Sequence, residues 1–593
     1  MLALLELRMT SRLIVSTLVL TPIAALALLA SPGDAQACGG TFCDNLPQPM
    51  PVDQRGEDIL FVMDGTTVEV HVRIQYQGDA ERFAWVLPLQ GVPEVAVGSD
   101  PLFTALSGAV GPSWQTERQY DCDEDQPGWD DDGGIKLDVP GGDGDGDPEV
   151  VFEAVVGAFE VVVLQGGTAA EVIDFLTDND YAQDPDAEPI LQEYLDEGFL
   201  FAAVKLTAGA EVDEIHPLAF RFAGDEPCVP IRLTRIAAEQ DMGIRAYFLG
   251  QDRWAPISYE HVVLNPLAYD WRIGGEFNYL ELLTLAVDEA GGHAFVTEYA
   301  GTSGVVPDTD IYRASWDEAA FIGADPITAL DLIGQQGLNV HPLIRALLLE
   351  YIPPPDGVDP TLFWNNIEDY ADQIDLDAWN DVAFAAALLE RIIEPGFHAV
   401  ELLETWPKLT RLNTTISPAE MTYDPMFVAN PDLPDIDNAR ITTVEQVLCG
   451  GDQLYHVDVE GTDTPVCVPD GEGYPSLADM PFALRIEKMP ELGPPQVITD
   501  NHAAIMAAYQ AYQAGVECLA EGSETGDTGD GPTGDGDGNE AADDSTSGEP
   551  SYSLPYDVTC GCSTDRGEAP IGVALGLLVL ALIGPWRRRS DGR

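Results

Sequence analysis

Basic residues are scarce in this chain of 593 residues, which has 27 lysines and arginines, only four of them lysine, against 102 aspartates and glutamates. The formal net charge is −75. Nucleic acids and anionic membrane surfaces are bound through basic contacts, so this charge argues against both partners. Acidic residues are densest at 121–149 and 521–549 but extend over the whole chain, which is typical of a solvated surface in a salty medium.

Catalytic motifs are also lacking. The sequence contains no H-E-x-x-H zinc helix, no P-loop and no G-x-S-x-G elbow. One G-x-G-x-x-G string, at 529–534, lies in a Gly/Asp-rich stretch and neither follows a strand pattern nor opens a helix pattern. Acidic residues are too frequent for a glycosidase-like pair to be chosen. The sequence therefore identifies no catalytic residue and no cofactor-binding residue.

The N-terminus has the pattern of a secretory signal peptide. Arginines precede an apolar run from Leu13 to Ala30, and Ala35 and Ala37 form an A-x-A cleavage pattern. An uncleaved membrane helix is the alternative, but Pro32 breaks the helix and favours cleavage. Cys38 would then begin the mature chain. A lipoprotein signal needs a branched apolar residue where Ala35 stands, so lipidation of Cys38 is the less favoured interpretation.

The C-terminus has three parts, which are a Cys-Gly-Cys motif, an apolar segment at 570–586 and a basic cluster, with Cys560, Cys562, Arg587, Arg588 and Arg589 as their marked residues. A helix over 570–586 rises ~25 Å, just under the ~30 Å of a hydrocarbon core. The arginines should stay on the cytoplasmic side, leaving the preceding chain outside. A buried core helix is the alternative, and the flanking acidic linker and arginines disfavour it.

This tail resembles the myxobacterial (MYXO-CTERM type) C-terminal sorting signal. The resemblance implies that export and sorting machinery recognise and process the tail, with Cys560 or Cys562 as the processing or lipid-attachment point. It also implies contact with the membrane through the helix, at least transiently. We therefore expect an exported protein of the cell envelope, held at the outer surface through its C-terminus, whose surface ligand is unknown.

The nine cysteines all lie in the part of the chain predicted to be exported, where structural disulfides are the default. Cys449 and Cys467 flank a hairpin pattern, so we expect them to pair. Two further candidate pairs are Cys38 with Cys43 and Cys122 with Cys228. Sequence alone does not fix the connectivity.

The predicted fold class is α+β, with a sandwich-like β-rich N-terminal region that carries a helical insertion. The expected segments are a signal peptide at 1–37, the β-rich region at 38–264 with an acidic insertion at 121–149, a mainly helical region at 265–408, a mixed region at 409–520 that ends in a helix, a disordered acidic linker at 521–559, and the sorting tail at 560–593 with one transmembrane helix at 570–586.

Local patterns support this division. Residues 68–76 alternate between apolar and polar residues, which predicts a half-buried strand with His71 on its polar side. A capping-box pattern opens a predicted helix at 169–177. Residues 231–236 predict a further strand, and Asp377 is the predicted N-cap of a helix that follows it.

Metal and base candidates are few. Asp143, Asp145 and Asp147 imitate the start of a calcium loop, but proline occupies the sixth position, where an EF-hand needs glycine, so only weak calcium binding stays open. His293, five places before Glu298, can be read as a base or ligand, yet no second ligand stands at metal spacing. A structural role is therefore favoured. Tryptophans that could line a groove, but for which core packing is favoured, are Trp85, Trp114, Trp254 and Trp271.

Several short motifs resemble the uncharacterised bacterial secreted family known as domain of unknown function 2330; they are ACGGTFC at 37–43, DILF at 58–61, FAWVLP at 83–88, GHAFVTEY at 292–299 and LTRLNTTIS at 409–417. The resemblance implies a shared location and fold, and it brings no activity and no catalytic residues. We expect a surface protein with a non-catalytic binding or structural domain. The alternatives are a secreted hydrolase with an unrecognised acidic or metal site, and a calcium-dependent adhesion protein.

Overall fold

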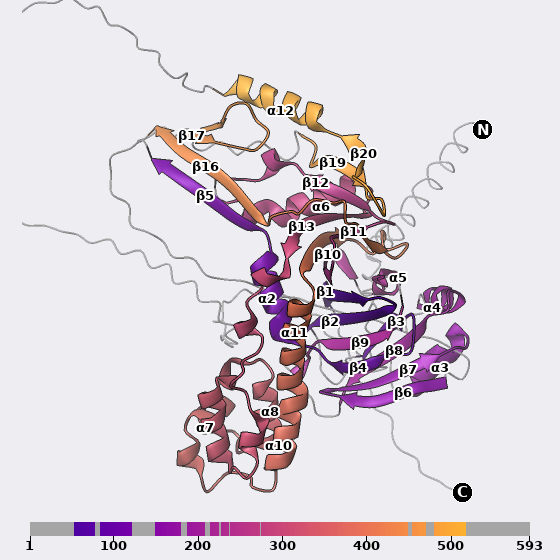
Figure 1. Ribbon diagram of the computed structural model, residues 1–593, viewed down its shortest axis with the longest axis vertical. Coiled ribbons are helices and arrows are strands. Elements are labelled where there is room, and N and C mark those ends of the chain that lie inside the picture. The colour runs from indigo at the N-terminus through magenta and orange to yellow at the C-terminus, as the bar shows by residue number, and fades with distance from the viewer. Residues whose placement is uncertain are drawn as a thin grey trace, which may run out of the picture. The chain divides into compact units, whose positions relative to one another are not determined.

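The computed structural model describes residues 53–77, 84–120, 149–179, 187–207, 214–224, 227–236, 238–272, 274–448, 454–469 and 480–516. They lie in one compact unit, Met1–Leu519. This part of the chain is a mixed α/β structure built on large sheets (Figure 1), which confirms the predicted class at that level.

A ten-stranded sheet organises the unit. Its strands, in spatial order, are β20 (Gln496–Asp500), β19 (Ala483–Lys488), β12 (Glu260–Leu264), β13 (Ala294–Thr302), β14 (Lys408–Ile416), β10 (Ala238–Gly250), β1 (Asp53–Asp64), β2 (Thr67–Gln77), β9 (Leu218–Ala223) and β4 (Glu94–Val97). Strands far apart in sequence are neighbours, since β1 pairs in parallel with β10 and β10 pairs antiparallel with β14. The expected segment boundaries at 264 and 408 therefore fall within one sheet.

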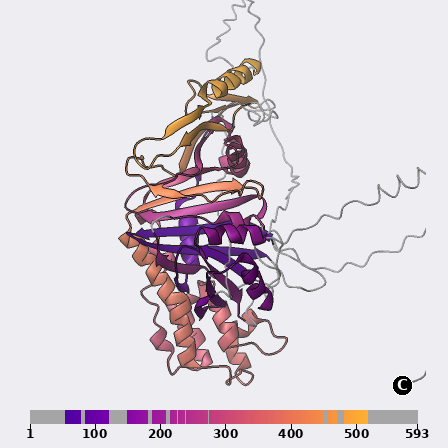
Figure 2. The ribbon, with the colours of Figure 1, turned by 90° about the vertical axis from the view of Figure 1, so that its right-hand side faces the viewer.

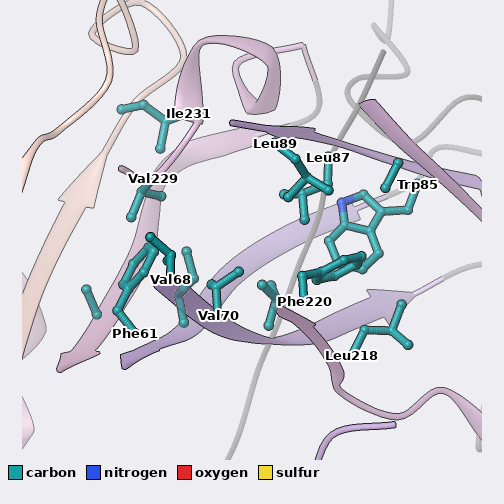
Figure 3. Packing of buried hydrophobic residues seen from close by; sticks show 14 of the residues in the cluster. Phe61, Val68, Val70, Trp85, Leu87, Leu89, Leu218, Phe220, Val229 and Ile231 are labelled. Atoms are coloured by element: carbon teal, nitrogen blue, oxygen red, sulfur yellow. The ribbon is translucent and has the colours of Figure 1, made fainter. Parts of the chain in front are cut away.

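A smaller sheet packs on one face of the large one and forms the sandwich-like part. Its strands are β3 (Ala84–Leu89), β8 (Leu200–Leu206), β7 (Phe159–Gln165) and β6 (Glu149–Val156). Figure 3 shows Phe61, Val68 and Val70 of the large sheet in the same apolar cluster as Trp85 and Leu87 of the small sheet. Helices α3 (Ala169–Asp178) and α4 (Ala187–Asp196) pack on the other face of the small sheet.

The opposite face of the large sheet is covered by α2 (Asp100–Val110) and α11 (Glu394–Thr405). Leu60, Tyr247 and Leu409 of three neighbouring strands pack there with Phe103 of α2 and Leu402 of α11. The odd and even residues of each central strand thus belong to two different cores, as the period of a strand requires.

Helix α11 continues from a largely helical region, which has its own apolar cluster. The region comprises α7 (Pro326–Gln336), α8 (Ile344–Tyr351), α9 (Pro360–Asn365) and α10 (Asp381–Leu388). A π-helical turn, η10 (Leu389–Ile393), joins α10 to α11. Figure 2 shows these helices together beyond one edge of the strands, with α11 reaching back to them.

Two further sheets and three helices complete the described residues. A four-stranded sheet consists of β18 (Val466–Pro469), β17 (Leu454–Val457), β16 (Ala439–Leu448) and β5 (Ser113–Tyr120). Its apolar side chains share a cluster with those of α6 (Tyr279–Glu289) and α12 (His502–Gly515). A two-stranded sheet pairs β11 (Trp254–Pro256) with β15 (Phe427–Ala429), and α5 is the short helix Ile231–Thr234.

Two local predictions were wrong. The strand expected at 231–236 is α5, because the backbone N–H of Arg232 donates to the Asp424 carboxylate (3.1 Å) and its guanidinium binds the same group, so a tertiary contact overrides strand propensity. The N-cap of α10 is Asn380, whose Oδ1 accepts from the backbone N–H of Ala383 at 3.0 Å, whereas Asp377 lies in the preceding turn.

No helix within the described ranges is both long enough and apolar enough to cross a membrane. The expected transmembrane helix at 570–586 lies outside those ranges and stays a prediction.

Candidate metal-binding site

Strand β2 contributes two adjacent polar side chains to one face of the large sheet. Val68, Val70 and Val72 enter the sandwich core, so Glu69 and His71 point to the opposite face. Both are nevertheless buried, since Glu69 is 8% and His71 is 2% exposed. The sheet therefore places a carboxylate and an imidazole side by side in a site of low water access.

Helix α11 brings a third side chain to this pair. His398 Nε2 lies 2.5 Å from Glu69 Oε1, and His71 Nε2 lies 2.9 Å from the same oxygen. The two imidazole rings are stacked, with centroids 6.1 Å apart and planes inclined by 22°. The π-helical turn that precedes α11 is of a kind that recurs at functional sites.

The three groups perturb one another's protonation. Burial alone raises the pKa of Glu69, but hydrogen bonds from His398 and His71 outweigh burial and hold that pKa well below its usual range. The hydrogen bond to Glu69 raises the pKa of His398, against the opposing effect of burial. Glu69 is therefore an anion at neutral pH that attracts positive charge, either imidazolium or metal ion.

Small residues open a cleft in front of this cluster. In the sheet, His71 lies opposite Ala219 of β9, which in turn lies opposite Ala96 of β4. The cleft has a volume of about 510 Å³, and its further walls come from β6 and from η10 and α11. The charged residues in its lining, besides the cluster, are Glu94, Arg221, Glu390 and Glu394.

The donor set suits a metal ion. One atom each from Glu69, His71 and His398 can be chosen so that all lie within 4.8 Å of one another. Two imidazole nitrogens and one carboxylate oxygen are the three protein ligands of many zinc sites whose fourth position is open. His398 Nδ1 lies 3.7 Å from a carboxylate oxygen of the exposed Glu401, which is close enough for electrostatic attraction but too far for a hydrogen bond.

Most site residues predicted from sequence lie outside the described ranges, so those predictions stay untested. They are the calcium candidates Asp143, Asp145 and Asp147, the cleavage residues Ala35 and Ala37, the tail residues Cys560, Cys562, Arg587, Arg588 and Arg589, and the half-cystine candidates Cys38, Cys43, Cys122 and Cys449. Cys228 forms an isolated backbone β-bridge with Met426, and Cys467 of β18 lies opposite His456 of β17. The predicted disulfides Cys122–Cys228 and Cys449–Cys467 stay predictions.

His293 and Glu298 are not brought together. His293 stacks on Tyr423 with centroids 4.6 Å apart, and its nitrogens face Gly291 O and Thr422 Oγ1. Glu298 is fully buried and bonds with Tyr279 and Asn413. Trp85, Trp254 and Trp271 are buried as the core-packing interpretation requires, and Trp114 contacts Tyr279 edge to face.

The cluster is not predicted from the sequence, whose alternation predicts only that His71 lies on the polar face of its strand. A usable signal was the Glu-x-His spacing of Glu69 and His71, which puts both on one face of a strand. No sequence signal pointed to His398, because it lies 329 positions from Glu69 and meets it only through the packing of α11.

The fold and site define a mixed α/β protein with a metal-compatible cleft. Residues 32–327 match the model of a family described as "Uncharacterized protein conserved in bacteria (DUF2330)". This match supports the resemblance seen in the sequence for that part of the chain, and it brings no specific activity. The sorting-tail resemblance lies outside the matched residues and stays a prediction.

The comparison with curated proteins gives no match. Among solved structures, the chain is similar to the 3.1 Å crystal structure of a mutated baculovirus P35 after caspase cleavage, with 13% sequence identity and a TM-score of 0.18. The similarity covers 35% of this chain and 70% of that one. At that TM-score it carries no argument about fold or function.

Proposed function

We propose that this chain is an exported envelope protein that binds one divalent transition-metal ion through Glu69, His71 and His398. The convergence of these three donors on one side of an acidic cleft carries the proposal. It gives a specific ligand to the surface-binding function that the sequence predicts. It also departs from the sequence prediction that no cofactor beyond weak calcium is involved.

The donor chemistry favours zinc over calcium or magnesium. Imidazole suits zinc, copper, iron and nickel, whereas calcium and magnesium take oxygen ligands almost exclusively. The lining glutamates Glu94, Glu390 and Glu394 add negative charge, which raises the local concentration of cations. The Nε2 atoms of His71 and His398 both already contact Oε1 of Glu69, so only small side-chain shifts are needed for an ion to bind between these three atoms.

The proposed location rests on sequence alone. The signal pattern ending at Ala37 and the tail after Cys560 support export and retention at the outer surface. An envelope location would expose the cleft to metal ions outside the cytoplasm.

Equilibrium dialysis of the purified chain against ZnCl2, with metal measured by mass spectrometry, tests the proposal. We expect one zinc ion per chain, and a thermal midpoint that rises with zinc concentration because the ion binds only the folded site. His398→Ala should weaken zinc binding by at least about tenfold, and Glu69→Gln and His71→Gln should do the same. Calcium chloride at equal concentration should not compete.

His293→Ala is the matched control, because His293 is a half-buried histidine that lies outside the cluster and bonds with Gly291 and Thr422 instead. It should bind zinc like the unaltered chain. Unchanged zinc binding in His398→Ala, or equal loss in His293→Ala and His398→Ala, would contradict the proposed site.

A further inference from the structure

A second group of buried polar side chains lies at the junction of β12, β13 and β19, away from the metal-binding cluster. His261 of β12 lies directly opposite Glu487 of β19, and its Nδ1 is 3.3 Å from Glu487 Oε2. Its Nε2 lies 2.9 Å from the hydroxyl oxygen of Thr297 on β13. Each of the three residues is at most 5% exposed, so the geometry is held by the surrounding sheet.

The hydrogen-bond partners of these side chains determine which atom donates and which accepts in each bond. Arg253, also buried, donates from Nη2 to Thr297 Oγ1 at 3.0 Å. Burial raises the pKa of Glu487, but hydrogen bonds from His261 and Arg485 outweigh it and lower that pKa, so the carboxylate can only accept. His261 Nδ1 must therefore donate to Glu487.

Burial also lowers the pKa of His261, so at neutral pH the imidazole is neutral and its Nε2 is an acceptor. The Thr297 hydroxyl then donates to Nε2. This is the tautomer in which a histidine can take a proton from a hydroxyl.

The strand geometry places Thr297 at the lining of a cleft. The parallel pairing of β12 with β13 covers only Glu260 with Ala294 and His261 with Phe295. Past that point the strands diverge. The pairing of β13 with β14 shifts register between Thr297 and Tyr299, a bulge of the kind that re-aims side chains beside active sites.

The resulting cleft of about 420 Å³ is lined by both Thr297 and His261. Glu487 is not among the lining residues and contacts Nδ1 of His261, the ring nitrogen that does not meet Thr297, as an orienting carboxylate does. The lining also includes apolar and aromatic residues, among them Tyr269, Trp271 and Ile441, and its charged residues are Arg440, Glu460 and Arg485. An apolar acyl group fits such a lining.

We propose that this cleft hydrolyses carboxylic esters of apolar acyl groups, with Thr297 as the nucleophile and His261 as the general base. Thr297 Oγ1 attacks the ester carbonyl carbon while His261 Nε2 takes the hydroxyl proton. The ester C–O bond breaks, and the alcohol leaves with that proton. Water then attacks the acyl-threonine through the same base, which releases the carboxylic acid and restores the hydroxyl.

Arg253 and Glu487 have separate roles. The Arg253 guanidinium touches the reacting oxygen and stabilises negative charge that develops on it. Glu487 is a positioning residue that holds the imidazole in its tautomer. This function goes beyond metal binding and does not depend on it.

Two measurements on the full chain test the proposal, namely hydrolysis of p-nitrophenyl butyrate and labelling by diisopropyl fluorophosphate, with the adduct located by peptide mass spectrometry. We expect an adduct on Thr297. Thr297→Val and His261→Gln should each lower hydrolysis by at least about 100-fold and abolish the adduct. Glu487→Gln should lower the rate of ester hydrolysis while any adduct still forms on Thr297. Glu487→Asp, which keeps a carboxylate, should hydrolyse the ester faster than Glu487→Gln. Addition of EDTA should change nothing.

Thr415→Val is the matched control, because Thr415 is a buried threonine of the same sheet whose hydroxyl donates to Thr284 instead. It should hydrolyse the ester like the unaltered chain. If Thr297→Val fails to fold, Thr297→Ser keeps a hydroxyl and should still be labelled at position 297. A folded chain that shows no adduct at position 297, or hydrolysis that survives in Thr297→Val, overturns the proposal.

Discussion

His398 of helix α11 places Nε2 2.5 Å from Oε1 of Glu69 in strand β2, across 329 positions of sequence. The contact ties the helical region to the large sheet through one ionisable pair.

The Glu69–His398 contact predicts a pH-dependent stability in metal-free protein. The hydrogen bond to Glu69 raises the pKa of His398, so its contribution is complete below about pH 6.5 and is lost as pH rises through the folded pKa. His398→Gln should therefore lower the thermal midpoint more at pH 6 than at pH 9 in the presence of EDTA. An equal loss at both pH values would argue against an imidazolium at this position.

Glu57 predicts a pH dependence of the same direction that begins at a lower pH. Burial, with a smaller effect of Asp58, raises its pKa to about 8, and its Oε2 has no hydrogen-bond partner among the residues that the structure describes. The folded protein holds this proton more tightly than the unfolded chain, so stability should fall as pH rises from about 4.5 to about 8. Glu57→Gln should flatten this decline in urea unfolding at pH 5 and pH 9. Exposed Glu153→Gln is the control, and a decline that persists in Glu57→Gln would contradict the assignment.

The buried carboxylate of Asp424 predicts a large loss of stability. Arg232 Nη2 lies 2.9 Å from Oδ2 of Asp424 and 2.6 Å from Oε2 of the half-exposed Glu197. Asp424→Asn removes the buried charge partner of the guanidinium and leaves it only partly exposed carboxylates, and loss of a buried partner typically costs about 3–5 kcal/mol in urea unfolding. Glu197→Gln should cost about 1 kcal/mol or less. Similar losses in the two variants would show that burial of Asp424 does not matter.

Substitution of two glycines that both have positive φ distinguishes the cost of a steric clash from the cost of backbone strain. At Gly157 (φ +59°) an added Cβ would lie 2.1 Å from His216 Nε2, whereas at Gly198 (φ +89°) it would meet nothing within 4 Å. Gly198→Ala should cost about 1 kcal/mol from backbone conformation alone, and Gly157→Ala clearly more. Urea unfolding of both variants measures the difference, and equal costs would mean that the His216 ring moves aside freely.

Local sequence patterns predicted much of the secondary structure. The capping box predicted at the start of the helix 169–177 forms at the N-terminus of α3, where the Thr168 backbone N–H donates to the Glu171 carboxylate at 3.1 Å. The alternation at 68–76 became β2. Such features depend on neighbours a few residues apart. The strand expected at 231–236 failed because Asp424, far along the chain, supplies the partner that decides the backbone conformation there.

The acidic character, the mixed α/β class, the capped helices and the alternating strands follow from the sequence, because charge, periodicity and local hydrogen bonding reside in short stretches of chain. Only the tertiary structure decided which strands pair and which side chains converge. Glu69 and His71 acquire His398, and His261 acquires Thr297 and Glu487, through packing across distant segments. No local pattern encodes those contacts, since burial of apolar faces on both sides of one sheet brings them together.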